Sequence, residues 1–310
     1  MKKITVLVPT FNEEENVIPL SEAIFNEFRG GLQDYECELL FIDNDSKDGT
    51  RDKIRGLCAS DPKIKAIFNA KNYGQFSSPY YGLLQAEGDC VIMMAADFQD
   101  PVELIPQYVK EWEAGHKIVL GQKTASKESR IVYAMRSVYY RFLRKRSDVD
   151  FIEHVTGSGL YDRKFIEVLR TVDEPRPFIR GVVAEMGYDI KLVRYEQPKR
   201  RSGRSSNGIS GYYDAGMQGV TSYTKFGVRA AVFFGILFTI ASIAVSAGLF
   251  IYKLLNWNTF ELMGLAFNMA IFLAVSLQML FIGIVGEYVL NINSRMKKRP
   301  LVIESERINF

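Results

Sequence analysis

The chain has 310 residues, of which 39 are basic and 36 acidic, so its formal net charge is only +3. That length allows one large domain or two smaller ones. The near balance of charge argues against a nucleic-acid-binding protein, because such proteins usually carry a concentrated basic excess. The three cysteines are scattered without a CxxC pair, which favours reduced thiols in a protein that faces the cytosol.

Residues 1–225 alternate between short apolar runs and amphipathic stretches. Strands are predicted at ITVLVP, CELLFID, KIKAIFN, DCVIMMAAD and KIVLG, and helices are predicted at EENVIPLSEAIFNEF, TRDKIRGLCAS, SSPYYGLLQAE and PVELIPQYVKEWEAG. The apolar part of the N-terminal MKKITVLVPT is too short for a signal peptide, and we interpret it as the first strand. Alternating strands and helices predict an α/β domain with a mostly parallel sheet.

Polar residues follow three of the predicted strands, in VPTFNEE, FIDNDSKDGT and AADFQDP. Open parallel sheets bind ligands beyond the carboxyl ends of their strands. A carboxylate at such a place can hold a divalent metal ion, and the metal can neutralise a diphosphate leaving group. A single aspartate after a strand is more often a turn residue or a helix cap. Three such sites in order along one domain favour a functional edge of the sheet.

Two long apolar segments follow, at about residues 230–252 and 262–290. Each can cross a bilayer, which takes about 20 helical residues. Buried helices of a soluble core are the alternative, but those normally keep a polar face. The connector KLLNWNTFE is short, so residues 226–294 are predicted to form a transmembrane hairpin.

The charges around the hairpin predict its orientation. Lys225 and Arg229 precede the first apolar segment, the connector holds a single lysine, and four cations follow the second segment: Arg295, Lys297, Lys298 and Arg299. The positive-inside rule then places the domain of residues 1–225 and the basic tail of residues 295–310 in the cytoplasm, at the inner or plasma membrane.

Two basic stretches precede the hairpin. Residues 129–146 place basic side chains among Tyr, Phe, Leu and Val, which favours an amphipathic helix on the membrane surface. A solvated helix packed on the sheet is the alternative for this stretch. Residues 199–211 have the composition of a flexible basic linker.

The segments VLVPTFNEEENV, FIDNDSKDGT, NAKNYGQ, AADFQDPVELI and RRSGRSS, followed by two apolar helices, resemble the polyprenyl-phosphate glycosyltransferases. These are GT-A enzymes of glycosyltransferase family 2, related to bactoprenol glucosyltransferases and dolichyl-phosphate mannose synthase. The resemblance runs through nearly the whole chain. It implies a GT-A fold followed by a membrane hairpin, Mg²⁺ or Mn²⁺ as cofactor, and a homo-oligomer, a tetramer, as one form of assembly.

The resemblance also implies a reaction. A membrane-bound inverting hexosyltransferase would move a sugar from a nucleotide-sugar donor to a polyprenyl phosphate, such as undecaprenyl phosphate, on the cytoplasmic leaflet for modification of cell-envelope glycans. The expected donor is a UDP-hexose or a UDP-N-acetylhexosamine. A phosphate monoester is largely dianionic at neutral pH, so the acceptor needs no strong general base.

Residue roles follow from the same resemblance. Pro9, Phe11 and Glu13 match the first-strand motif that lines the nucleotide pocket, and Asp43 matches the acid that contacts the base or the ribose. The next three residues are Asn-Asp-Ser, where the family usually has Asp-Gly-Ser.

The metal site is expected after the fourth predicted strand. Asp97 matches the metal-binding acid of the family's Asp-x-Asp motif, and Gln99 matches the glutamine that helps to hold the metal. Ala95 takes the place of the first acid of that motif, so its contact to the nucleotide must be lost or replaced by water. A lower metal affinity is expected as a result.

Phosphate contacts are expected from two further places. Lys123 stands where relatives have an arginine near the acceptor phosphate. Arg200, Gly203 and Ser205 match a loop that closes over the phosphates. Asp97, Lys123 and Arg200 are therefore the expected catalytic residues.

Two other functions fit parts of the sequence. A catalytically degenerate membrane scaffold that binds a nucleotide-sugar is favoured by Ala95. A processive polysaccharide synthase is the other alternative, but such enzymes usually have more membrane helices and a Gln-x-x-Arg-Trp motif that this sequence lacks.

Overall fold

The computed structural model describes residues 1–125, 130–147, 149, 151–152, 155–175, 177–198, 209–255, 263–296 and 299–310. Within these residues one sheet has the strand order β7-β5-β6-β4-β1-β2-β3-β8. The strands are β1 (Lys2–Thr10), β2 (Tyr35–Asp43), β3 (Ile64–Asn69), β4 (Cys90–Met93), β5 (Ile118–Ala125), β6 (Val155–Asp162), β7 (Ile190–Glu196) and β8 (Glu304–Ile308).

The centre of the sheet is parallel. Strand β1 pairs in parallel with β2 and β4, and β3 and β7 extend the sheet through parallel pairs with β2 and β5. Strands β6 and β8 run antiparallel to their neighbours. The register sets Thr10 opposite Asp43, so β1 and β2 end at the same edge. The predicted α/β domain with a mostly parallel sheet is confirmed.

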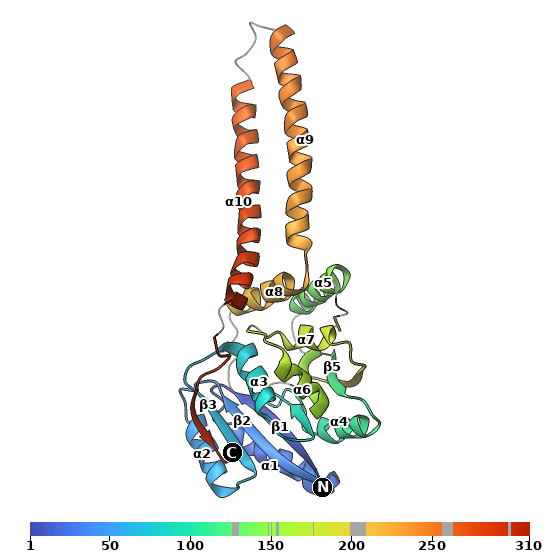
Figure 1. Ribbon diagram of the computed structural model, residues 1–310, viewed down its shortest axis with the longest axis vertical. Helices are drawn as coiled ribbons and strands as arrows, with labels where there is room; N and C mark the ends of the chain where they lie inside the picture. Colours follow the sequence, from blue (N-terminus) through green and yellow to red (C-terminus); the bar gives the residue numbers. More distant parts are fainter. Residues whose placement is uncertain are drawn as a thin grey trace.

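Helices cover both faces of the sheet, which buries its central strands on both sides (Figure 1). This burial explains the continuous apolar run of β1, since neither face of the strand meets water. One face carries α1 (Val17–Gly31), α2 (Thr50–Ser60) and α4 (Leu104–Glu113). The other face carries α3 (Gly74–Gln85), α6 (Arg163–Thr171) and α7 (Ile179–Glu185).

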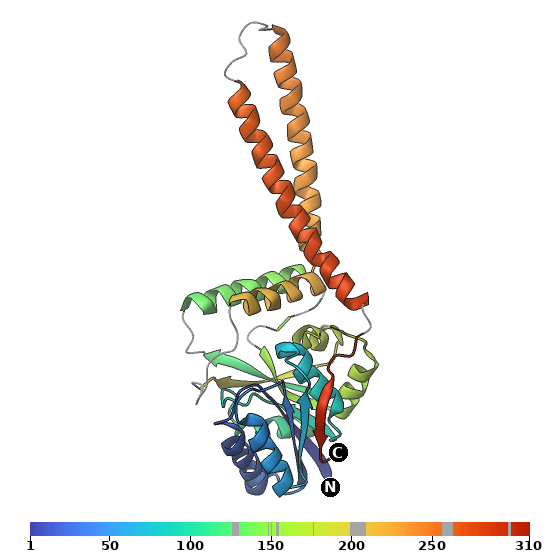
Figure 2. The ribbon, with the colours of Figure 1, turned by 90° about the vertical axis from the view of Figure 1, so that its left-hand side faces the viewer.

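Four further helices form the connecting layer and the apolar hairpin. Helices α5 and α8 lie side by side across the top of the domain, and α9 and α10 project away from them as an antiparallel pair (Figures 1 and 2). Their bounds are α5 (Arg130–Arg146), α8 (Ile209–Tyr223), α9 (Phe226–Leu255) and α10 (Met263–Met296). Within α9 and α10, Phe226–Tyr252 and Leu273–Asn293 are long and apolar enough to cross a membrane, judged by length and composition.

An aromatic cluster joins α5 and α8 to the domain. Phe178, just before α7, packs its ring against Tyr223 of α8 at 6.2 Å between centroids, and Phe151 packs against the same tyrosine at 5.4 Å. Gly181 of α7 lies directly beneath the Tyr223 ring, where an added Cβ would come within 2.3 Å. The absence of a side chain at Gly181 therefore allows the close approach of α7 and α8.

Strand β8 is an element that the sequence patterns did not predict. The predicted basic tail of residues 295–310 contains it, and it pairs antiparallel with β3 at the edge of the sheet. The Arg55 guanidinium binds the Glu306 carboxylate at 2.8 Å, and the Asn309 amide donates to the carbonyls of Cys58 and Ile64 at 2.8 Å each. The chain therefore returns from the hairpin to the domain where it began.

Candidate active site

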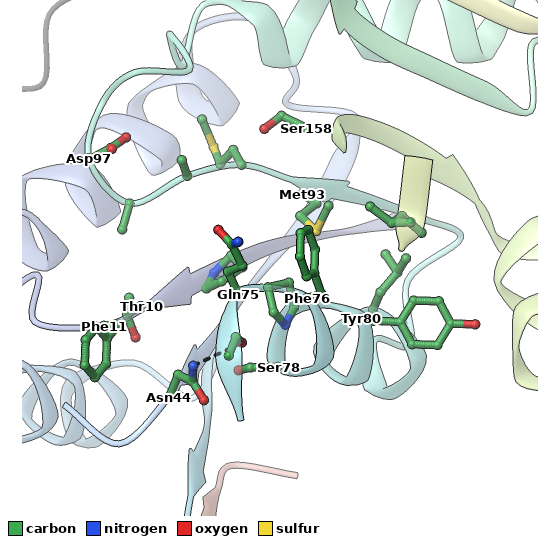
Figure 3. A pocket seen from close by; sticks show the side chains of 18 of the residues that line it. Thr10, Phe11, Asn44, Gln75, Phe76, Ser78, Tyr80, Met93, Asp97 and Ser158 are labelled. Atoms are coloured by element: carbon green, nitrogen blue, oxygen red, sulfur yellow. Dashed lines mark hydrogen bonds between the residues drawn. The ribbon is translucent and has the colours of Figure 1, made fainter. Parts of the chain in front are cut away.

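A cavity of about 340 Å³ opens at the carboxyl ends of the central strands (Figure 3). Strand β1 and the loop after it supply one wall, the loop after β4 supplies the opposite wall, and the start of α3 lies between them. The first turn of α7 closes a further side with Ile179 and Arg180. The cavity is thus at the edge of the sheet where the sequence placed the polar strand ends.

The loops after β1 and β2 are tied to each other. Asn12 has a φ of 56°, a left-handed conformation that asparagine tolerates better than most residues. Its backbone N–H donates to the Ser46 hydroxyl at 2.8 Å, and its side-chain oxygen accepts from the Lys47 N–H at 2.8 Å. The Glu13 N–H donates to the Thr50 hydroxyl at 2.9 Å. These bonds hold Phe11 and Glu13 at the wall of the cavity.

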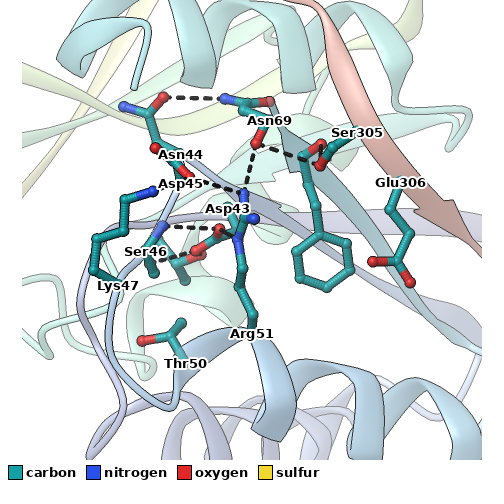
Figure 4. A network of polar contacts seen from close by, with 12 residues as sticks. Asp43, Asn44, Asp45, Ser46, Lys47, Thr50, Arg51, Asn69, Ser305 and Glu306 are labelled. Carbon is teal, nitrogen blue, oxygen red and sulfur yellow. Dashed lines mark hydrogen bonds and ion pairs between the residues drawn. The ribbon is translucent and has the colours of Figure 1, made fainter. Parts of the chain in front are cut away.

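Asp43 is fully buried at the end of β2 and is surrounded by donors (Figure 4). Its carboxylate binds the Arg51 guanidinium at 2.6 Å and accepts from the Ser46 N–H at 3.1 Å and from the Ser46 hydroxyl. Arg51 also donates to the Asn69 carbonyl at 2.6 Å. Asp43 is not among the described residues that line the cavity. In this structure its carboxylate organises the loop after β2.

Asn44 connects that loop to the start of α3. Its side-chain oxygen accepts from the Tyr73 N–H at 2.8 Å, and its amide donates to the side chain of Asn72 at 2.9 Å. The next residue, Asp45, has a φ of 68°, which is the conformation that favours glycine. Glycine adopts this conformation without strain, which is a physical reason why the family pattern Asp-Gly-Ser has glycine where this chain has Asp45. Asn44 itself lines the cavity and was not predicted to do so.

Two aspartates follow β4, and they have different surroundings. Asp100 is buried, and its carboxylate accepts from the Ala95 N–H at 3.2 Å, from the Tyr195 hydroxyl at 2.6 Å and from the Ser158 hydroxyl. Asp100 therefore holds the loop against β6 and β7. Asp97 is only 4 % exposed but lines the cavity, and its carboxylate accepts from the Gln99 N–H at 3.1 Å. Asp97 is thus the carboxylate of this loop that faces the cavity.

Comparison with known proteins agrees with this geometry. Residues 5–180, more than half of the chain, match the family described as glycosyl transferase family 2. The chain belongs to glycosyl transferase family 2. The SfII prophage-derived bactoprenol glucosyl transferase of Shigella flexneri is 30 % identical over 97 % of each chain. The bactoprenol glucosyl transferase of Shigella phage SfV is 30 % identical over 98 % of this chain and 99 % of its own length.

A solved structure is also similar to this chain, at low identity. Glucosyl-3-phosphoglycerate synthase from Mycobacterium tuberculosis, in complex with Mn²⁺, UDP and phosphoglyceric acid, is 16 % identical with a TM-score of 0.48. The match covers 71 % of this chain and 76 % of that one. From the family match, the expectations of a GT-A fold and of a glycosyltransferase are confirmed.

The predicted site residues of this glycosyltransferase fall into three groups. Pro9, Phe11, Glu13 and Asp97 line the cavity together. Asp43, Gln99 and Lys123 are not among the described lining residues. Arg200, Gly203 and Ser205 lie outside the described residues. The roles given to all of these residues stay predictions.

Gln99 and Lys123 lie outside the cavity lining, next to residues of the site or of its supporting strands. Gln99 reaches Asp97 by its backbone N–H. Lys123 is half-buried in β5, where it pairs with Tyr195 of β7. Tyr195 in turn donates to Asp100, so Lys123 is one strand away from the acid that holds the cavity loop.

Arg180 was missed in the sequence. It lines the cavity from the first turn of α7 and is the only basic residue among the described lining residues. Its guanidinium donates to the Tyr140 hydroxyl on α5 and lies 5.8 Å from the centre of the Phe178 ring. The segment RPFIRG that contains it has no metal-ligand or nucleophile spacing, and only the folded arrangement brings it to the cavity.

The carboxylates of the cavity suit a metal ion that is bound together with the diphosphate of a substrate. The described residues contain no group of three or more His, Cys, Asp or Glu side chains placed to hold a metal ion. Asp97 and Glu13 are the carboxylates that line the cavity in the described part of the chain. Mg²⁺ is commonly held by one or two carboxylates together with substrate phosphates and water, rather than by an all-protein cage.

Burial raises the pKa of the lining Tyr80 to about 12, so this phenol stays protonated at neutral pH.

Proposed function

We propose that the chain moves a hexose or an N-acetylhexosamine from its UDP carrier to a polyprenyl phosphate, such as undecaprenyl phosphate, on the cytoplasmic leaflet. The relatives named bactoprenol glucosyl transferases, similar over nearly the whole chain, support this acceptor. The observation that carries the proposal is the link between the cavity and the membrane-side helices. Arg180 lines the cavity and bonds to Tyr140 of α5, next to the hairpin.

The chain's own residues bind and orient the two substrates in this proposal. Phe11 offers a flat apolar face to the nucleotide base, while Asp97 would hold Mg²⁺ or Mn²⁺ with the diphosphate. Gln99 is the proposed second contact to the metal. When bound, the metal neutralises charge on the leaving group. Arg180 supplies a guanidinium, which suits bidentate contact to a phosphate oxygen pair.

Positioning accounts for the remaining catalysis. The acceptor phosphate is already a nucleophile, so the enzyme must align its oxygen with the anomeric carbon and keep water away. One displacement of this kind inverts the anomeric configuration. Lys123 and the loop with Arg200, Gly203 and Ser205 remain proposed contacts for anionic phosphate.

A turnover assay tests the proposal. Purified full-length protein, given a divalent metal, a panel of nucleotide-sugars and undecaprenyl phosphate, should yield a lipid whose mass rises by one sugar residue. Donor binding without any lipid product would instead support the nucleotide-sugar-binding scaffold. The panel also identifies the sugar and the nucleotide.

The metal assignment predicts the effect of Asp97→Asn. The variant should fold but lose roughly a thousandfold in kcat, because several kcal/mol of charge stabilisation depends on the metal. Turnover across Mg²⁺ and Mn²⁺ titrations measures the loss. Asp34→Asn, at an exposed carboxylate outside the cavity, is the matched control. Near wild-type turnover of Asp97→Asn would remove Asp97 from the metal site.

A further inference from the structure

A second cavity, of about 400 Å³, lies where the end of α5 meets the start of α9. Three cations line it: Arg146 from α5, and Lys225 and Arg229 from the chain entering the hairpin. The other described lining residues are apolar, namely Phe226, Ala230, Phe233 and Phe234. None of these residues lines the active-site cavity.

Aromatic contacts shape the wall of this cavity. The Arg146 guanidinium lies over the Phe226 ring, 4.9 Å from its centre. The same ring packs edge-on against Phe142 of α5, with 5.0 Å between centroids. Phe142 belongs to the aromatic cluster that includes Phe178, which lines the active-site cavity. The two cavities share no described lining residue, so an anion held in the second cavity would not be at the reaction centre.

The charges of the cavity call for an anion. No acidic residue is among its described lining residues, and the guanidinium groups of Arg146 and Arg229 both border this space next to an apolar hairpin. Mutual repulsion between like charges grows as the surroundings become less polar, and an anion placed among them would relieve it. The guanidinium groups of Arg146 and Arg229 suit a phosphate in particular.

We propose that this cavity binds the headgroup phosphate of an anionic glycerophospholipid, such as phosphatidylglycerol. The lining fits an amphiphile, because the cations lie at the start of the hairpin and Phe233 and Phe234 continue along α9. Basic pockets at the membrane-facing ends of helices attract anionic lipid headgroups. The bound lipid would fix α5 against α9 and so support the base of the hairpin. This inference rests on the proposed placement of the hairpin in a membrane.

Lipid retention by the full-length protein tests the site. The protein is loaded with phosphatidylglycerol, exchanged into a zwitterionic detergent at high salt, and examined by native mass spectrometry. Wild type should retain a single phosphatidylglycerol. Arg146→Gln and Arg229→Gln should each lower the retained fraction about tenfold, the size of one lost charge-assisted hydrogen bond. Arg229→Lys should keep only part of the retention, because it keeps the charge but loses the planar guanidinium.

Lys145→Gln is the matched control. Lys145 is an exposed cation next to Arg146 that does not line the cavity, and its replacement should leave retention unchanged. An equal loss in Lys145→Gln would mean that the basic surface attracts anionic lipid in general, which would overturn the proposal. No retention by wild type would also overturn it, because the cavity would then hold no lipid.

A parallel loading with polyprenyl phosphate separates the two lipid sources. Preferred retention of polyprenyl phosphate, lost in the same two variants, would identify the cavity as a binding site for the acceptor lipid. This result would also overturn the proposal. Circular dichroism checks that each variant is folded. Retention is measured without turnover, so a failure of the transferase assay and a failure of this site are distinguishable.

Discussion

At the scale of single residues, the aspartates at the ends of β2 and β4 differ in role, because two of them order the loops and one lines the cavity. Asp43 and Asp100 are both buried among donors, and their carboxylates order the loops after β2 and β4. Asp97 comes from the same loop as Asp100 but lines the cavity. Each lies at or just beyond the end of a strand, so sequence position alone does not distinguish their environments.

Arg180 yields a prediction at this scale. If its guanidinium holds a substrate phosphate, Arg180→Ala should lower kcat/KM about 100- to 1000-fold, the range for loss of one preorganised charge-stabilising contact. Steady-state kinetics with the sugar donor and the polyprenyl phosphate measure the effect.

Tyr140→Phe is the control for Arg180. It removes the hydroxyl that accepts from the guanidinium but leaves the positive charge in the cavity. The loss of one hydrogen bond should cost about tenfold or less. Similar losses in Arg180→Ala and Tyr140→Phe would mean that Arg180 only holds α5 against the domain.

The sequence allowed four cavity residues to be predicted, and the reason is local. Pro9 lies near the end of β1, Phe11 and Glu13 lie in the loop after it, and Asp97 lies in the loop after β4, each within a short contiguous motif that resembles the family. Arg180 and Ser158 reach the cavity from α7 and β6, which are distant in the sequence from the loops after β1 and β4. Their placement depends on packing between distant segments, which periodicity and short motifs do not report.

At the scale of elements, the strands and helices as far as α5 were predicted from the sequence, whereas β6, β7, β8, α6, α7 and α8 were not. Helix α1 buries Val17, Leu20, Ile24 and Phe28, which recur at helical spacing and therefore predict a helix from sequence. Strand β8 has five half-buried or exposed residues, with charges at three of them. From the sequence alone, such a pattern resembles a charged tail. Only its pairing with β3 in the folded structure identifies it as a strand.

Strand β8 predicts an effect of truncation. Removing residues 304–310 would expose the edge of β3 and remove the bonds of Glu306 and Asn309. With several hydrogen bonds lost at about 1 kcal/mol each, the domain should be destabilised by about 3 kcal/mol. Thermal unfolding of the purified protein measures this. Glu306→Gln alone should cost only about 0–1 kcal/mol, because the ion pair is partly exposed. An unchanged Tm after truncation would contradict a structural role for β8.

Asp162 connects three elements and predicts a pH dependence. It caps α6 by accepting from the Lys164 N–H at 3.0 Å, and it also accepts from the Trp112 indole at 2.7 Å and from Lys117 at 3.2 Å. Burial alone would raise the pKa of this carboxyl, but the hydrogen bonds from Trp112, Lys164 and Lys117 outweigh it and hold the pKa below the ordinary 3.8.

The sign of the effect follows from the lowered pKa. The charged carboxylate stabilises the fold above the unfolded-state pKa, and this stabilisation is lost as the pH falls through the folded-state pKa. Asp162→Asn should therefore cost about 1–3 kcal/mol at neutral pH and much less near pH 3. Tm values across that range give the comparison, with the exposed Asp173→Asn as control. A Tm difference between Asp162→Asn and wild type that stays constant with pH would contradict the assignment.

At the scale of the whole molecule, β8 bears on the orientation of the hairpin. The chain leaves the domain through α8 and α9, and α10 leads back to a strand in the same sheet as β1. If α9 and α10 span the membrane, the two ends of the hairpin must lie on the same side. This agrees with the predicted topology, although the compartment itself still depends on the positive-inside rule.

The connector between the two helices, residues 256–259, should then lie on the face of the membrane opposite the domain. It falls outside the described residues, so its position is predicted from the hairpin alone. The native Cys37, Cys58 and Cys90 are free and buried, and they are replaced before labelling. A cysteine placed at Asn258 should react with an impermeant maleimide on intact cells. A cysteine placed at the exposed Asp34 of the domain should react only after permeabilisation. The reverse pattern at the two positions would place the active site on the outer face, where cytoplasmic nucleotide-sugars do not reach it.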